Sequence, residues 1–226
     1  MQVPVLTSEN GVTVTGGGEI TRQTLVEALT HAPDLVAADG AAGTLRGFGL
    51  TPRAVVGDFD SLDEATRAAL DPATLHHVPE QNSTDFEKCL TRVEAPLILA
   101  VGFMGKRPDH ELAVYNAIVR HSGLRAGARR VIVVGETDVC LHVDGALSLD
   151  LPVGTRVSLF PMAKVRGVSR GLKWPIAGIP FASDGRIGTS NEMAAERLEI
   201  EMDGAGMLMF LPRAALGSVV AALRAL

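Results

Sequence analysis

The chain has 226 residues, of which 46% are hydrophobic and 21% are charged, and its formal net charge is -5. These are ordinary values for a globular protein, and they exclude an intrinsically disordered chain. The negative net charge argues against a nucleic-acid-binding protein whose affinity depends on neutralising backbone phosphates.

The first 134 residues alternate between short apolar runs and mostly helical patterns. The runs are residues 12–15, 35–38, 54–56, 97–101 and 131–134. Short apolar strands that alternate with helices indicate a mostly parallel sheet that is covered on both faces. Ligands of such sheets bind beyond the carboxyl ends of the strands, so the residues that follow each run are candidate site residues.

The first expected helix starts from Thr21. Its apolar positions fall on one predicted face, which consists of Leu25, Val26, Ala28 and Leu29. This spacing is typical of an amphipathic helix that packs on a sheet.

The pattern changes near Gly135. Short, partly alternating segments then follow at residues 139–143, 147–151, 156–160, 198–202 and 207–211. Such segments, separated by Gly, Pro and Asp turns, predict a small antiparallel β domain. An amphipathic helix is expected from Pro212 to the end, with one apolar face formed by Leu216, Val219, Val220 and Leu223.

The two cysteines, Cys89 and Cys140, are far apart and lack CxxC spacing. We therefore expect two reduced, mostly buried thiols rather than a disulfide. The chain has no signal-peptide pattern and no apolar run of about 18 residues. These features predict a cytoplasmic protein without a membrane span.

Four aspartates follow predicted strands or lie in the loop after one: Asp39, Asp58, Asp60 and Asp109. In an extended segment, Asp58 and Asp60 would point to the same side, where two carboxylates need a cation. Magnesium, which prefers oxygen ligands, suits such a pair. The alternative is that these aspartates form turns and helix caps. Ser61 with Glu64 has the capping-box spacing, which predicts that Ser61 starts a helix.

Two further segments carry candidate phosphate ligands. Thr84 and Glu87 also have the capping-box spacing, which places Asp85 and Lys88 on the first turn of a helix. Backbone N–H groups and a lysine at such a terminus can bind phosphate, although the segment is equally typical of a well-capped helix. Residues 102–110 form a glycine-containing loop with two cations before Asp109 and His110, for which a solvated basic loop is the alternative.

The motifs, taken in order, resemble the thiamine pyrophosphokinase family. The matching stretches span residues 12 to 211: Ala38-Asp39-Gly40, Gly57-Asp58-Phe59-Asp60-Ser61, residues 81–88, Arg107-Pro108-Asp109-His110, Gly171-Leu172-Lys173-Trp174-Pro175 and Thr189-Ser190-Asn191-Glu192. One departure lies in the loop often written GGRxDH, where Lys106 replaces a glycine.

The resemblance implies a three-layer α/β catalytic domain in residues 1–134 and a C-terminal β-sandwich in residues 135–226 that binds thiamine and forms a homodimer. The implied magnesium ligands are Asp58, Asp60 and Asp85, with Asp39 close by. Lys88, Arg107, Asp109 and His110 are the implied nucleotide and phosphate contacts, and the implied thiamine contacts are Gln81 and, from the partner subunit, Trp174 and Ser190.

The residues themselves agree with the thiamine contacts but leave alternatives. Trp174 is the only tryptophan, and its indole face suits a flat cationic heterocycle, although it could instead fill a domain interface. Ser190 lies in a predicted Gly-Thr-Ser-Asn turn, where it could simply cap its own backbone.

The expected activity is magnesium-dependent transfer of a diphosphoryl group from ATP to the hydroxyl of thiamine. Asp85 and Asp39 both remain candidates for the proton acceptor. The alternatives are a pyrophosphokinase for another heterocyclic alcohol, such as a hydroxymethyl pterin, and a non-catalytic nucleotide or thiamine sensor.

Overall fold

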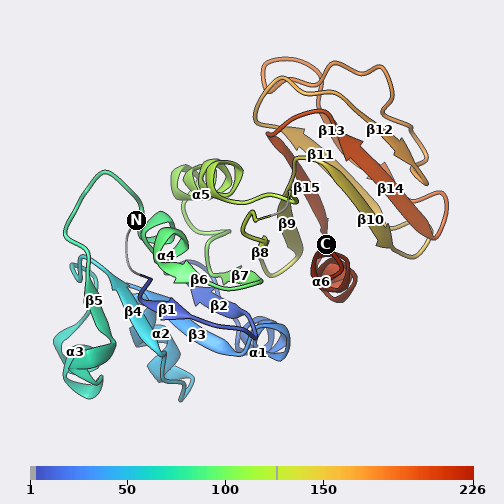
Figure 1. Ribbon diagram of the computed structural model, residues 1–226. Helices are drawn as coiled ribbons and strands as arrows, with labels where there is room; N and C mark the ends of the chain where they lie inside the picture. The colour runs from blue at the N-terminus through green and yellow to red at the C-terminus, as the bar shows by residue number, and fades with distance from the viewer. Residues whose placement is uncertain (1–3, 126) are drawn as a thin grey trace. The chain divides into compact units, whose positions relative to one another are not determined.

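The computed structural model describes residues 4–125 and 127–226, which form two compact units (Figure 1). The first unit holds the chain up to Ala117 together with Val133–Glu136. The second holds Ile118–Ile132 and Thr137–Leu226.

The first unit contains a parallel sheet in the order β7-β2-β3-β4-β5. Its strands are β2 (Val12–Thr15), β3 (Asp34–Ala38), β4 (Ala54–Gly57), β5 (Leu75–His77) and β7 (Ile98–Val101). All residues of β2, β4 and β7 are buried, which requires that both faces of the sheet are covered. The predicted α/β architecture is therefore confirmed. A separate parallel pair joins β1 (Leu6–Thr7) to β6 (Val93–Glu94).

Helices connect these strands, as the alternating pattern predicted. They are α1 (Arg22–His31), α2 (Ala41–Gly47), α3 (Glu64–Ala69), the 3₁₀ turn η1 (Pro72–Thr74), α4 (Asp85–Arg92) and α5 (Pro108–His121). Thr21 caps α1, because its side chain accepts a hydrogen bond from the Thr24 N–H. The predicted apolar face of α1 is wrong at Val26, whose side chain is exposed, whereas Thr24 is buried in its place.

The second unit consists mainly of two antiparallel sheets. One has the order β13-β11-β15-β9 and the other β10-β14-β12. The strands are β9 (Asp138–Val143), β10 (Ala146–Asp150), β11 (Arg156–Pro161), β12 (Gly167–Arg170), β13 (Gly188–Glu192), β14 (Arg197–Met202) and β15 (Met207–Pro212). Strand β8 (Val131–Val134) contains the point at which the chain passes from the second unit to the first. Buried and exposed residues alternate along β14, as expected for a strand with one face on a core.

The C-terminal helix follows Pro212 as predicted, after the 3₁₀ turn η2 (Arg213–Ala215). Helix α6 (Leu216–Arg224) buries the four residues of its predicted apolar face and packs against β10. Cys89 and Cys140 are both free and buried, which confirms the expectation for the thiols. In the described parts of the chain, no helix combines the length and the apolar character that a membrane crossing requires.

Candidate active site

A pocket of about 510 Å³ lies in the first unit, where the parallel strands end. Its walls include residues 16–18 after β2, residues 38–41 at the end of β3, residues 102–104 after β7 and the start of α4. The segment after β4 contributes Asp58, Asp60 and Ser61. The carboxyl ends of parallel strands meet at one edge of a sheet, so four segments far apart in sequence converge there. Three of the four aspartates predicted to follow strands, Asp39, Asp58 and Asp60, meet here, whereas the fourth, Asp109, does not line the pocket.

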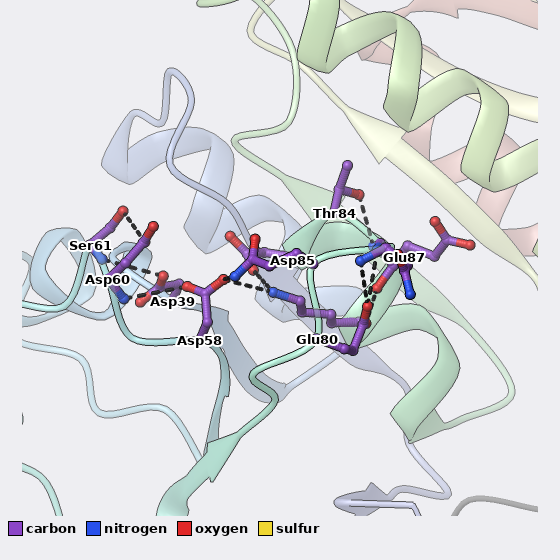
Figure 2. Close-up of polar contacts among 12 residues, drawn as sticks. Asp39, Asp58, Asp60, Ser61, Glu80, Thr84, Asp85 and Glu87 are labelled. Atoms are coloured by element: carbon purple, nitrogen blue, oxygen red, sulfur yellow. Dashed lines mark hydrogen bonds and ion pairs between the residues drawn. The ribbon is translucent and has the colours of Figure 1, made fainter.

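These three aspartates form a compact group of carboxylates. Each offers one oxygen that lies within 4.8 Å of the oxygens from the other two. Asp39 is 2% exposed, and its Oδ1 is buried without a hydrogen-bond partner among the described residues. Its Oδ2 accepts the Ser61 N–H at 3.4 Å. Figure 2 shows the three side chains drawn together from the segments after β3 and β4.

The surroundings of Asp39 disfavour its ionised form. Burial raises the pKa of Asp39 to about 7, and a hydrogen bond with Asp60 and the negative charge of Asp85 act in the same direction. The Ser61 N–H opposes this shift only in part. A buried, unpartnered carboxylate oxygen beside two further carboxylates is an arrangement that a divalent cation would stabilise. Oxygen ligands of this kind fit magnesium.

Lys88 connects this group to helix α4. Its ammonium lies 3.0 Å from Asp58 Oδ2 and 3.1 Å from Asp85 Oδ1, and its side chain is 2% exposed. The hydrogen bond from Lys88, followed by one from Gln81, holds the pKa of Asp58 well below its usual range. Burial alone would lower the pKa of Lys88, but its two carboxylate partners outweigh burial and raise it.

Asp85 behaves differently from Asp58, although both contact the same lysine. Burial raises the pKa of Asp85 more than the bond from Lys88 lowers it. Asp85 does not belong to the group of three carboxylates that lie within 4.8 Å. Its place at the first position of α4 follows from Thr84, whose side chain accepts the Glu87 N–H at 3.3 Å and caps the helix as predicted.

The turn after β4 corrects two predictions. Residues 58–60 are not extended, because Phe59 has a φ of 67° and the Asp60 N–H reaches back to Asp58 Oδ1 at 3.3 Å. Ser61 does not start a helix. Asp63 caps α3 by accepting the Thr66 N–H at 2.8 Å, and the Ser61 hydroxyl instead donates to Asp60.

The other residues predicted for phosphate and thiamine occupy varied positions. Arg107 and His110 line the pocket, whereas Asp109 is not among the lining residues and forms two hydrogen bonds with Arg107, at 2.8 and 3.2 Å. Gln81 lines the pocket too, and its Nε2 donates to Asp58 Oδ2 at 2.9 Å.

Sequence reasoning missed part of the pocket wall. Phe86, Phe103, Met104 and Val114 form apolar lining, and the rings of Phe86 and Phe103 lie 4.5 Å apart. Phe103 and Met104 lie in the loop of residues 102–110, which was selected for its cations and not for its apolar side chains. Gly16, Gly17 and Gly18, which directly follow β2, also line the pocket.

Trp174 and Ser190 belong to the second unit, where the structure brings their segments together. The Trp174 N–H donates to Asn191 Oδ1 at 3.2 Å, and Asn191 Nδ2 donates to the Trp174 carbonyl at 2.7 Å. The indole is 53% exposed, and the Lys173 ammonium lies 4.9 Å from its ring centre. Ser190 lies within strand β13 rather than in the predicted turn, with a φ of 61° beside a register shift in β11.

Comparisons with known sequences are consistent along the chain. A family model described as thiamin pyrophosphokinase, catalytic domain, matches residues 25–129, and one described as thiamin pyrophosphokinase, vitamin B1 binding domain, matches residues 146–206. Thiamine pyrophosphokinase 1 of Arabidopsis thaliana is 26% identical over 183 residues, which cover 67% of this chain and 62% of the relative. The matched region therefore spans less than two thirds of that relative. Thiamine pyrophosphokinase 2 of Oryza sativa subsp. japonica is 25% identical over 210 residues, which cover 77% of this chain and 76% of the relative.

Solved structures share the fold over most of the chain. Thiamin pyrophosphokinase from Candida albicans superposes with a TM-score of 0.76 at 15% identity, covering 90% of this chain and 89% of that one. The yeast thiamin pyrophosphokinase gives a TM-score of 0.76 at 18% identity, covering 94% of this chain and 89% of that one.

Proposed function

The chain belongs to the thiamin pyrophosphokinase family, and on that premise we propose that it transfers the diphosphoryl group of ATP to thiamine. In this reaction the hydroxyl oxygen of thiamine forms a bond to the β-phosphorus, the bond between that phosphorus and the α,β-bridging oxygen breaks, and AMP leaves. The observation that carries the proposal is the group of three carboxylates, with one buried unpartnered oxygen, in the pocket at the sheet edge.

Asp39, Asp58 and Asp60 would hold magnesium, and Asp85 lies near enough to influence the charge of Asp39. When bound, the metal would neutralise phosphate oxygens and fix the diphosphate for in-line transfer. Asp58 suits this role, because the hydrogen bonds from Lys88 and Gln81 favour its ionised form.

The chain's own cations and carboxylates perform the remaining tasks in this proposal. Lys88 orients Asp58 and Asp85 through its two hydrogen bonds. Arg107, on the pocket wall, offsets negative charge on the transferred group. Asp85 is the candidate to accept the hydroxyl proton, because it lies outside the group of three carboxylates and burial raises its pKa.

Thiamine would be bound by the second unit of a partner subunit in a homodimer. The half-exposed indole of Trp174 offers a face for stacking, and the hydrogen bonds through Asn191 hold its backbone beside Ser190. We assign ATP and metal binding to residues 1–134 and thiamine binding and dimerisation to residues 135–226. The free, buried cysteines suit a cytoplasmic location.

The direct test is to incubate the protein with ATP, magnesium and a panel of hydroxyl acceptors, including thiamine and a hydroxymethyl pterin, and to measure AMP and the diphosphorylated product. We expect AMP and thiamine diphosphate in equal amounts. Product from the pterin but not from thiamine would assign another substrate, and no AMP with any acceptor would refute the proposed reaction.

Two sets of variants test the site. The double variant Asp58→Asn with Asp60→Asn should slow AMP formation about 100-fold or more, whereas Asp184→Asn, in an exposed turn of the second unit, should not. A double variant with near wild-type activity would exclude the metal assignment. Trp174→Ala should raise the KM for thiamine about tenfold but not the KM for ATP, and Trp174→Phe should restore most of the loss.

A further inference from the structure

Two glycine-containing loops, residues 16–18 and residues 102–107, lie against each other at the pocket. The Gly18 N–H donates to the Gly102 carbonyl at 2.7 Å. A Cβ at Gly18 would lie only 2.5 Å from that carbonyl oxygen, so this close approach requires glycine. The two loops therefore present a fixed backbone surface beside the carboxylates.

Lys106 reaches from the second loop to the first. Its Nζ donates to the Gly17 carbonyl at 3.1 Å, and its exposed side chain lines the pocket. The backbone before it is braced by α5, because Glu111 Oε2 accepts the Gly105 N–H at 2.9 Å. Tyr115 donates to the other Glu111 oxygen at 2.5 Å. The position of the Lys106 backbone is thus set by the fold.

The three lysine and arginine side chains that line the pocket differ in their partners. Lys88 is shared between two carboxylates, and Arg107 makes two hydrogen bonds to Asp109. Lys106 contacts a neutral backbone carbonyl, and no carboxylate within the described part of the chain pairs with it. An incoming anion can therefore engage Lys106 without breaking an ion pair.

We propose that Lys106 binds the polyphosphate of a nucleotide, exchanging its bond to the Gly17 carbonyl for bonds to phosphate oxygens. The bond to phosphate joins two oppositely charged groups, whereas the bond to the Gly17 carbonyl joins the ammonium to a neutral group, so the exchange is favourable. In this proposal the Lys106 ammonium contacts the phosphates from the side of the pocket formed by the two glycine loops. The three carboxylates that would hold the metal line the same pocket. Lys106 stands where the GGRxDH pattern has a glycine, which has no side chain to make this contact. The proposed contact is therefore specific to chains with a lysine at this position. The inference rests on the proposed function for the identity of the nucleotide.

The test measures equilibrium binding of ATP and of adenosine, by calorimetry with magnesium, to the wild type and to four variants. Lys106→Ala and Lys106→Gly should each weaken ATP binding about tenfold and leave adenosine binding unchanged. Lys106→Arg should restore ATP affinity to within about twofold, because it retains the positive charge. Lys164→Ala removes the same type of side chain from an exposed position in the second unit and should change neither affinity.

A second readout separates a phosphate contact from a structural effect. The salt dependence of ATP binding should be shallower in Lys106→Ala than in the wild type, because one charge–charge interaction has been removed. The proposal would be overturned if Lys106→Ala left ATP affinity unchanged, if it lowered ATP and adenosine affinity equally, or if it left the salt dependence unchanged. A wild type that does not bind ATP would also overturn it.

These binding measurements need neither thiamine nor turnover. A wild type that binds ATP through Lys106 but forms no thiamine diphosphate would refute the proposed function and leave this contact standing. An active wild type whose ATP affinity survives Lys106→Ala would refute the contact alone.

Discussion

Replacing Asp39 with asparagine should make the metal-free protein more stable at alkaline pH while it weakens magnesium binding. The carboxylate is buried, has an unpartnered oxygen and lies beside two other carboxylates. Asparagine removes the charge and keeps the shape. It also tolerates the left-handed backbone found here, where φ is 40°.

The magnitude follows from the raised pKa of Asp39, about 7 against 3.8 for the free group. Between these values the folded state retains a proton that the unfolded state has lost, so the free energy of unfolding falls as pH rises. Each pKa unit corresponds to about 1.4 kcal/mol, which gives a penalty of roughly 4 kcal/mol above pH 7 as an upper value. Between pH 5 and pH 8, the stability advantage of Asp39→Asn over the wild type should grow by roughly 3 kcal/mol.

The assay is urea unfolding followed by circular dichroism at pH 5, 6.5 and 8, in a chelator and again with magnesium. Asp34→Asn is a matched control at the start of β3, the strand that leads into Asp39. Hydrogen bonds from Ser8 and Arg53 lower the pKa of Asp34, so its charge does not change in this pH range. Parallel pH profiles for Asp39→Asn and the wild type would show that Asp39 does not hold a proton, and equal magnesium stabilisation of both would remove it from the metal site.

Substitutions at three further positions, Gly57, Thr84 and Lys88, test the packing of the site. Gly57→Ala would place a Cβ 2.7 Å from the Cβ of Asp39 and should reduce the free energy of unfolding, measured by urea titration, by about 1–3 kcal/mol. The control is Gly47→Ala in helix α2, where the added Cβ would meet nothing within 4 Å. This control should raise the free energy of unfolding by about 0.5–1 kcal/mol. Thr84→Ala should lower the free energy of unfolding by about 1 kcal/mol, because it removes the cap of α4, and Thr84→Ser should retain most of the wild-type stability. Equal stability of the two variants would contradict the capping role. Lys88→Met should lower the free energy of unfolding by about 3–5 kcal/mol, because two partly buried carboxylates lose their shared cation. If carboxylate charge is the cause, this decrease should be smaller at pH 4 than at pH 8.

The sequence predicted the buried strands well and the polar edge strands poorly. The parallel strands β2, β3, β4 and β7 consist largely of buried apolar residues, so their composition identifies them. The strands that were not predicted include β5, β12 and β13, each of which is an edge strand of its sheet. These three segments are short and carry few buried apolar residues, which weakens the periodic signal on which the prediction depends. The edge strand β10 was predicted because its buried and exposed residues alternate.

Within the site, the gathering of the carboxylates was predictable and their individual states were not. The strand-end rule needs only the order of strands along the chain. It selected Asp39, Asp58 and Asp60, which do meet, and also Asp109, which does not line the pocket. Which of them is buried, and which one Lys88 holds in its ionised form, depends on contacts between residues 30 positions apart. The cap at Ser61 was wrong for a similar reason, because a second acceptor, Asp63, competes two residues later.

The backbone provides an independent indication of where the site lies. Among the described residues, three that are not glycine have a positive φ: Asp39, Phe59 and Ser190. All three belong to segments that were predicted to bind metal or thiamine. A positive φ is unfavourable for these residues and persists only where surrounding contacts enforce it. At Phe59 those contacts are visible, because its ring stacks on His77 at 5.4 Å between centres and packs against the core beneath α2 and β3. The partly buried ring therefore holds the turn that brings Asp58 and Asp60 toward Asp39, so packing against the hydrophobic core of the first unit offsets the backbone strain of the carboxylate site.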